Sequence, residues 1–257
     1  MKLDLDYDFT LLMMIFLRMS GCILFNPIIG RKNIPPIIRA GLSLALTLFA
    51  YQTVPAQDLQ IHSFLSLALC GMKELAIGFV IGYIIQLFLS VFIMSGEMMD
   101  MQIGISMSQV YDPQSNISMP LSASIINTMF ILIFFASNGH LTLIRIFMKL
   151  CEAVPYGDAL LNPNALQSLV EMFSLILIYS VKLSMPIVAV QLISEIGVGL
   201  IMRAVPQIDV FVVEIQLKVL IGFLSILILV PSFAEFLEKL MDLMFDNITH
   251  VLAMILG

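Results

Sequence analysis

Six long apolar blocks, separated by short polar connections, limit what this sequence can fold into. They are Phe9–Ile29, Ile37–Ala56, Phe64–Met94, Leu121–Leu150, Leu166–Met202 and Val210–Phe233. Hydrophobic residues make up 60% of the 257-residue chain and charged residues only 12%, so a soluble domain is excluded and we predict an all-α membrane-class protein. A helix of about thirty residues is about 45 Å long, whereas the hydrocarbon core of a bilayer is about 30 Å thick. We therefore expect Phe64–Met94 to tilt, bend or leave the membrane, and Leu166–Met202 to kink or split at Pro186.

The stretch Gly96–Pro120 lies between two apolar runs but has an unusual composition. It contains the carboxylates Glu97 and Asp100, five methionines, and a break at Asp112-Pro113. Irregular backbone at membrane depth is tolerated only where protein buries it or where it lines a water-filled cavity. The stretch is therefore a candidate pathway or gate element.

Ten charged residues fall within the apolar blocks or at their edges. They are Arg18, Lys73, Glu74, Glu97, Asp100, Lys182, Glu195, Arg203, Glu214 and Lys218. A charge at the bilayer centre costs about 2.5–3.5 kcal/mol on insertion scales. Either these side chains pair inside the protein, or much of the chain packs against protein and not lipid. Glu214 and Lys218 stand four residues apart in the order that favours pairing on a helix, as a structural pair, a proton-linked site or an intersubunit contact.

Two further patterns indicate helix contacts. Gly78 and Gly82 form a GxxxG motif that permits close approach of another backbone. After Pro231, apolar residues recur at helical spacing opposite a mostly negative face. That amphipathic tail suits docking to protein better than to anionic lipid.

The sequence contains no enzyme signature. It lacks a phosphate-binding loop, a dinucleotide-binding glycine pattern and an HExxH motif, and its three histidines and three cysteines are scattered. We therefore predict no catalytic, cofactor or metal site. The net charge is −6 and no basic cluster is large enough to suggest nucleic-acid binding.

Several short motifs follow one another along the chain. They are Phe16-x-Arg18-x-x-Gly21, then Pro27, Gly30, Pro35 and Arg39, then Glu74, Gly78 and Gly82, then Gly96-Glu97-x-x-Asp100-x-Gln102-x-Gly104, Asp112-Pro113 and Asn138-Gly139-His140, and finally Gly199-x-x-x-Arg203-x-x-Pro206-Gln207-x-x-Val210-Phe211 with Lys218 and Gly222. In this order and spacing they resemble the FliR family, the R component of the flagellar type III export gate, whose injectisome counterpart is the T subunit. Asp209, Glu214 and Gln216 depart from the family pattern, which often has Asn or Ser, Gly and Pro at these positions. The Asn-Gly-His motif looks more flagellar than injectisome.

The resemblance implies a P-like helical part, residues 1–164, followed by a Q-like helical hairpin with the amphipathic tail, residues 165–257. It implies one R subunit that completes a closed helical ring with several P and Q subunits, in the inner membrane and flagellar basal body. The expected partners are these subunits, the B-type switch subunit, the A-type export subunit and unfolded flagellar export substrates. Export energy would come from the proton motive force and a separate ATPase.

The same resemblance implies a plug loop in the closed pore, at about 105–120. The candidate gate and plug residues are Gly104, Met107, Val110, Tyr111, Asp112, Pro113, Ile117 and Met119. The candidate assembly residues are Arg18, Glu74, Gly78, Gly82, Glu97, Asp100, Arg203, Pro206, Gln207, Glu214 and Lys218.

A small ion-coupled secondary transporter is the alternative function. Its coupling residues would be Glu97, Asp100, Lys182 or Glu214. Transporters are often built from inverted repeats with matching broken segments, and the sequence shows no such internal symmetry.

Overall fold

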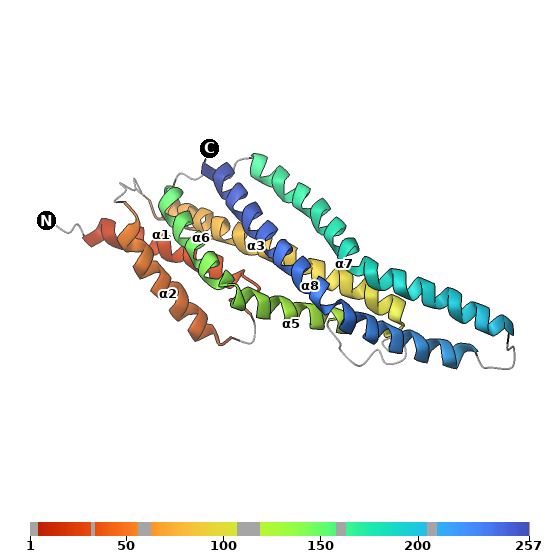
Figure 1. Cartoon of the computed structure of the whole chain (residues 1–257). Helices are drawn as coiled ribbons and strands as arrows, with labels where there is room; N and C mark the ends of the chain where they lie inside the picture. Colours follow the sequence, from red (N-terminus) through yellow and green to blue (C-terminus); the bar gives the residue numbers. More distant parts are fainter. Residues whose placement is uncertain are drawn as a thin grey trace. The chain divides into compact units, whose positions relative to one another are not determined.

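The chain is described here by a computed structural model, which covers residues 5–31, 34–55, 63–106, 119–157, 163–204 and 210–256. The helices are α1 (Leu5–Leu24), α2 (Pro36–Thr53), α3 (Phe64–Ile103), α5 (Leu121–Ala136), α6 (Gly139–Ala153), α7 (Pro163–Ala204) and α8 (Val210–Leu256), as Figure 1 shows. No strand occurs in the described ranges. The predicted all-α membrane-class fold is confirmed.

Three of these helices, α3, α7 and α8, are long and apolar enough to cross a membrane, and α5 with α6 would make a fourth span if counted together. α3 has 40 residues, α7 has 42 and α8 has 47. At about 1.5 Å per residue they measure roughly 60–70 Å, about twice the thickness of a hydrocarbon core. A single upright crossing would leave about half of each helix outside the lipid.

Some predicted helix boundaries are wrong. The stretch that starts at Gly96 is not irregular from its first residue, because α3 continues through Ile103. α7 does not split, since Pro186 lies inside one continuous helix; the alternative, a kink at Pro186, stays a prediction. The predicted block Leu121–Leu150 divides instead at Asn138, whose φ of 58° is left-handed and separates α5 from α6.

The described residues belong to two compact units. One comprises Met1–Phe88, Ser137–Met172 and Asp242–Gly257, and the other comprises Leu89–Ala136 and Phe173–Met241. In the first unit, α1 packs against α2 and α6, and α2 also contacts α6 (Figure 1). In the second, the rings of Phe92 on α3 and Phe130 on α5 lie 4.9 Å apart in the core. The predicted division near Asn164 into P-like and Q-like parts stays a prediction.

Candidate functional site

The first unit is built around a close contact between α1 and α3, made possible by three glycines. A Cβ on Gly78 would lie 2.4 Å from the Arg18 carbonyl oxygen, and one on Gly21 would lie 2.7 Å from the Leu75 carbonyl oxygen. One turn further along α3, a Cβ on Gly82 would lie 2.7 Å from the carbonyl carbon of Phe25. The GxxxG motif therefore packs backbone against backbone, as the sequence predicted.

This contact carries a fully buried ion pair. Arg18 on α1 donates from Nε and Nη2 to Oε2 of Glu74 on α3, each at 2.6 Å, and neither side chain is exposed. The other carboxylate oxygen of Glu74 accepts the backbone N–H of Gly157 at 3.1 Å. A buried charge needs such complete pairing, because an unpaired one is strongly destabilising.

Arg18 also binds the C-terminal end of α6. Its guanidinium donates to the carbonyl oxygens of Leu150 at 3.1 Å, Val154 at 2.7 Å and Pro155 at 3.3 Å. A cation at a helix C-terminus compensates for carbonyl groups that have no partner within the helix. The Tyr156 ring lies 3.8 Å from the guanidinium carbon, and burial raises the pKa of its phenol, which therefore stays neutral. One arginine thus joins α1, α3 and the turn after α6.

In the second unit, Asp100 caps the N-terminus of α5. Its carboxylate accepts the backbone N–H of Leu121 at 2.6 Å and of Ser122 at 3.2 Å, and it also accepts the Ser122 hydroxyl. Four residues later, Gly104 has a φ of 88°, a left-handed conformation that glycine adopts without strain, directly after the end of α3. The two ends of the predicted plug segment are therefore held together.

Most of the predicted plug lies outside the described residues. This applies to Met107, Val110, Tyr111, Asp112, Pro113 and Ile117. Met119 is described and half-buried, just before α5.

A second ion-pair cluster joins α7 to α8. The Lys218 ammonium lies 2.9 Å from Glu214, four residues earlier on α8, and 2.8 Å from Glu195 on α7. The predicted pairing of Glu214 with Lys218 is confirmed, and the three side chains are 19–35% exposed. Nearby, the Gln191 amide donates to the Lys218 carbonyl oxygen at 2.9 Å.

Comparison with known proteins places this architecture in a family. The model of bacterial export proteins, family 1, matches residues 9–244. The chain belongs to that family.

Its relatives include the flagellar biosynthetic protein FliR of Escherichia coli K12, which is 29% identical over 92% of this chain and 90% of the relative. The Bacillus subtilis 168 protein of the same name is 24% identical over 96% of both chains. The Caulobacter vibrioides protein is 28% identical over 84% of this chain and 86% of the relative. These matches confirm the predicted resemblance to the FliR family.

The remaining candidate assembly residues of this FliR-family chain belong neither to the Arg18–Glu74 ion pair nor to the Lys218 cluster in the part of the chain that the structure describes. Glu97 is exposed on α3, and Arg203 is exposed in the last turn of α7. Pro206 and Gln207 lie outside the described residues. Within the described ranges, no three His, Cys, Asp or Glu residues form a group that could hold a metal ion.

Three partnerships could not be read from the sequence. Arg18 and Glu74 are 56 residues apart, and no local spacing rule connects them. Glu195 as a second partner of Lys218 depends on how α7 lies against α8. The Asp100 cap spans 21 residues, and its only sequence signal is a carboxylate that precedes a break and a new helix.

Proposed function

We propose that this chain is a structural and gating subunit of the flagellar type III protein export gate in the bacterial inner membrane. The observation that carries the proposal is the family match over residues 9–244, together with FliR relatives matched over at least 80% of their length. By this relationship the chain completes a channel ring with P-like and Q-like subunits in the flagellar basal body. The B-type and A-type export subunits and unfolded export substrates are its further partners.

The distribution of charge supports a ring subunit. The buried charges are satisfied within the chain: Arg18 pairs with Glu74, and Asp100 accepts N–H groups at the start of α5. Long helices nevertheless leave large apolar side chains exposed, such as Leu227 at 71% and Ile228 at 73%. These helices are about twice as long as the hydrocarbon core is thick, so lipid cannot cover their whole apolar surface. Contact with sister subunits would bury the rest.

The residues that flank the segment support the assignment of a plug at about 105–120. We call them the stem: the end of α3 with Asp100 and Gly104, and the start of α5. Asp100 fixes the start of α5 against the end of α3, and Gly104 turns the chain away from the helix axis. A loop whose two ends are fixed at the same rigid point of the subunit can fill the channel lumen without disturbing the ring. Its apolar residues, among them Met107, Val110 and Ile117, supply the bulk, and flexible methionines can reseal around varied chains.

Ion conductance across the reconstituted export-gate complex tests the proposal. Deleting Ser106–Ser118 should leave the complex assembled but permeable to ions, and a glycine-serine segment of equal length should be permeable as well, because it restores length without bulk. Asp100→Ala should also increase conductance, since it releases the stem while keeping the loop sequence. A deletion complex as tightly closed as the unmodified one would remove the plug, and failure of the chain to co-purify with any export subunit would remove the gate assignment.

The geometry argues against the transporter alternative. Asp100 is committed to capping α5 and Glu214 to pairing with Lys218. Lys182 is exposed, 5.1 Å from the Tyr179 ring on its own helix. Glu97 is exposed on α3, so the four residues form no common ion site.

A further inference from the structure

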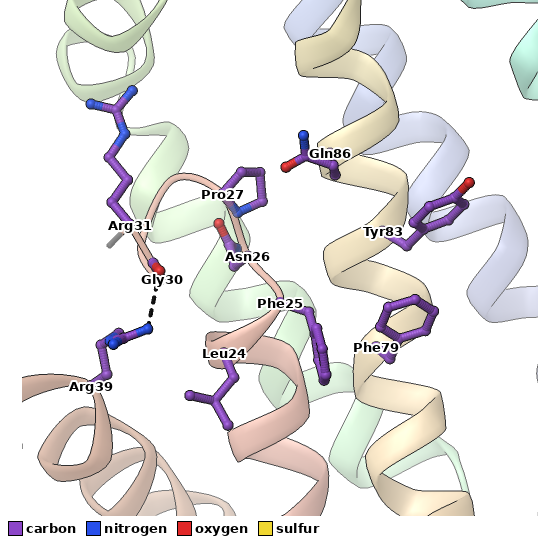
Figure 2. A pocket seen from close by; sticks show the side chains of 10 residues that line it. All are labelled: Leu24, Phe25, Asn26, Pro27, Gly30, Arg31, Arg39, Phe79, Tyr83 and Gln86. Carbon is purple, nitrogen blue, oxygen red and sulfur yellow. Dashed lines mark hydrogen bonds between the residues drawn. The ribbon is translucent and has the colours of Figure 1, made fainter. Parts of the chain in front are cut away.

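The turn between α1 and α2 lines a cavity of about 530 Å³ in the first unit (Figure 2). The lining residues are Leu24, Phe25, Asn26, Pro27, Gly30, Arg31, Arg39, Phe79, Tyr83 and Gln86. None of the ten is acidic, and two are arginines. In Figure 2, Phe79, Tyr83 and Gln86 belong to α3, opposite the turn that carries Asn26 and Pro27.

Two buried hydrogen-bond donors on residues that line this cavity have no acceptor in the described part of the chain. Asn26 is 1% exposed, and its Oδ1 accepts the N–H groups of Ile28 and Ile29, while its Nδ2 has no partner. The buried Nε of Arg39 has no partner either, and its Nη1 makes only a long bond of 3.4 Å to the Gly30 carbonyl oxygen. Buried donors without an acceptor cost free energy, so an acceptor that reached these two groups would stabilise the turn.

The charge of the cavity points the same way. Neither Arg31 nor Arg39 forms a salt bridge with a carboxylate in the part of the chain that the structure describes. Arg31 is exposed, and Figure 2 shows its side chain extending away from Arg39. A cavity that is lined by two arginines, neither of them in a salt bridge among the described residues, and by no acidic residue favours an anion, and arginine suits phosphate in particular.

An apolar groove of about 570 Å³ shares a lining residue with this cavity. Residues of α1 and α3 form it, namely Met13, Leu17, Phe64, Leu67, Ala68, Gly71, Met72, Leu75, Ala76 and Phe79. The two cavities share Phe79, whose ring packs edge-on against Phe25 at 4.8 Å. A cationic cavity beside a long apolar groove matches a molecule with a charged head and a hydrocarbon tail.

We propose that this composite site binds an anionic phospholipid, with its phosphate in the cavity at Arg39 and Asn26 and an acyl chain in the groove along α1 and α3. A membrane protein meets such lipids at high local concentration, and basic pockets beside membrane helices bind their head groups. An acidic segment of a partner protein would use the basic cavity but has no need of the apolar groove. The lipid accounts for both features.

Photolabelling of the full chain, purified with its co-purifying subunits into nanodiscs, tests the proposal. The probes are phosphatidylglycerol and phosphatidylcholine that carry the same diazirine in an acyl chain. Phosphatidylglycerol should label peptides that contain Met13–Leu17 and Ala68–Phe79, and phosphatidylcholine should label them about tenfold less.

Three variants probe the two halves of the site. Arg39→Gln removes a charge, and Asn26→Asp keeps the oxygen that accepts from Ile28 and Ile29 but replaces the free donor by an acceptor. Each should lower labelling by phosphatidylglycerol about tenfold, the usual worth of one hydrogen bond to a charged group. Ala68→Phe should fill the groove and lower labelling to a similar extent.

The control is Arg145→Gln, which removes an exposed arginine on α6, outside both cavities, and should leave labelling unchanged. Thermal unfolding of each purified variant separates loss of binding from loss of fold, and in the unmodified complex added phosphatidylglycerol should raise the unfolding temperature. Two results together would overturn the lipid assignment in favour of a site for a free anion. Inorganic phosphate would protect the site from photolabelling, and Ala68→Phe would be labelled as strongly as the unmodified chain. Unchanged labelling in Asn26→Asp together with loss of a co-purifying subunit would overturn it in favour of an acidic protein segment.

Discussion

At the scale of single residues, the free-energy cost of a charge in an apolar environment decides which positions tolerate change. Arg18 and Glu74 are completely buried. The Arg18 guanidinium donates to Glu74 and to backbone carbonyl groups, and these hydrogen bonds replace the ones that water would otherwise make. Replacing such a pair by apolar residues is often nearly neutral, whereas removing one partner strands the other. The pair is therefore expected to respond to mutation in a non-additive way.

Arg18→Met should lower the free energy of unfolding by about 3–5 kcal/mol, because it leaves the Glu74 carboxylate buried without its counter-ion. The double variant Arg18→Met with Glu74→Leu should lose less than Arg18→Met alone, although the Val154 carbonyl group loses the Arg18 donor and the Leu150 carbonyl group keeps only the Val154 N–H. Denaturant unfolding of the purified complex in detergent measures both values. A double variant as unstable as the sum of the two single variants would contradict the prediction.

The cluster around Lys218 predicts an unequal response of its three members. Lys218→Met strands two carboxylates, whereas Glu214→Leu leaves Lys218 paired with Glu195, and Glu195→Leu leaves it paired with Glu214. Lys218→Met should therefore impair assembly most, and partial solvent exposure limits each single carboxylate variant to about 1 kcal/mol or less. The yield of co-purified complex ranks the variants, and equal losses in all three would contradict this geometry.

At the scale of helices, the contact between α1 and α3 depends on the lack of side chains at its glycines. Gly78→Ala should separate the two helices, since its Cβ would lie 2.4 Å from the Arg18 carbonyl oxygen, and backbone cannot give way as a side chain can. Gly41 on α2 is the matched control, because nothing lies within 4 Å of its Cβ position. Gly41→Ala should be neutral or stabilise by up to about 1 kcal/mol. Unfolding temperatures of the two variants test this, and equal values would disprove the close contact.

Helix content and the tail after Pro231 were predictable from the sequence, because both depend on the local spacing of apolar residues. Phe233, Leu237 and Leu240 are buried as that spacing predicts. Helix ends were less predictable: the packing of Gly96 against Ala123 depends on tertiary structure and accompanies the extension of α3 beyond its apolar run. The partner of Arg18 could not be predicted from the sequence for the same reason, since the position of Glu74 depends on how α1 and α3 cross.

At the scale of the whole molecule, α7 and α8 leave many large apolar side chains exposed. Large side chains more than 60% exposed on α7 and α8 include Ile193, Ile196, Leu200, Leu227 and Ile228. Exposed contiguous apolar surface marks contact with protein or lipid. Because α7 and α8 are about twice as long as the hydrocarbon core of a bilayer is thick, we expect part of this surface to be an intersubunit contact.

Ile228→Lys should therefore block assembly of the export-gate complex while the chain still inserts into the membrane, because a buried, unpaired ammonium in a protein contact is costly. Gln216→Lys is the control, since it adds the same charge at an exposed polar position of α8. Co-purification with P-like and Q-like subunits measures assembly, and carbonate extraction of membranes measures insertion. The unassembled variant should be degraded in cells, as should the unmodified chain expressed without these subunits. Loss of insertion would show instead that Ile228 faces lipid, and a monodisperse, protease-resistant monomer would contradict the dependence on partners altogether.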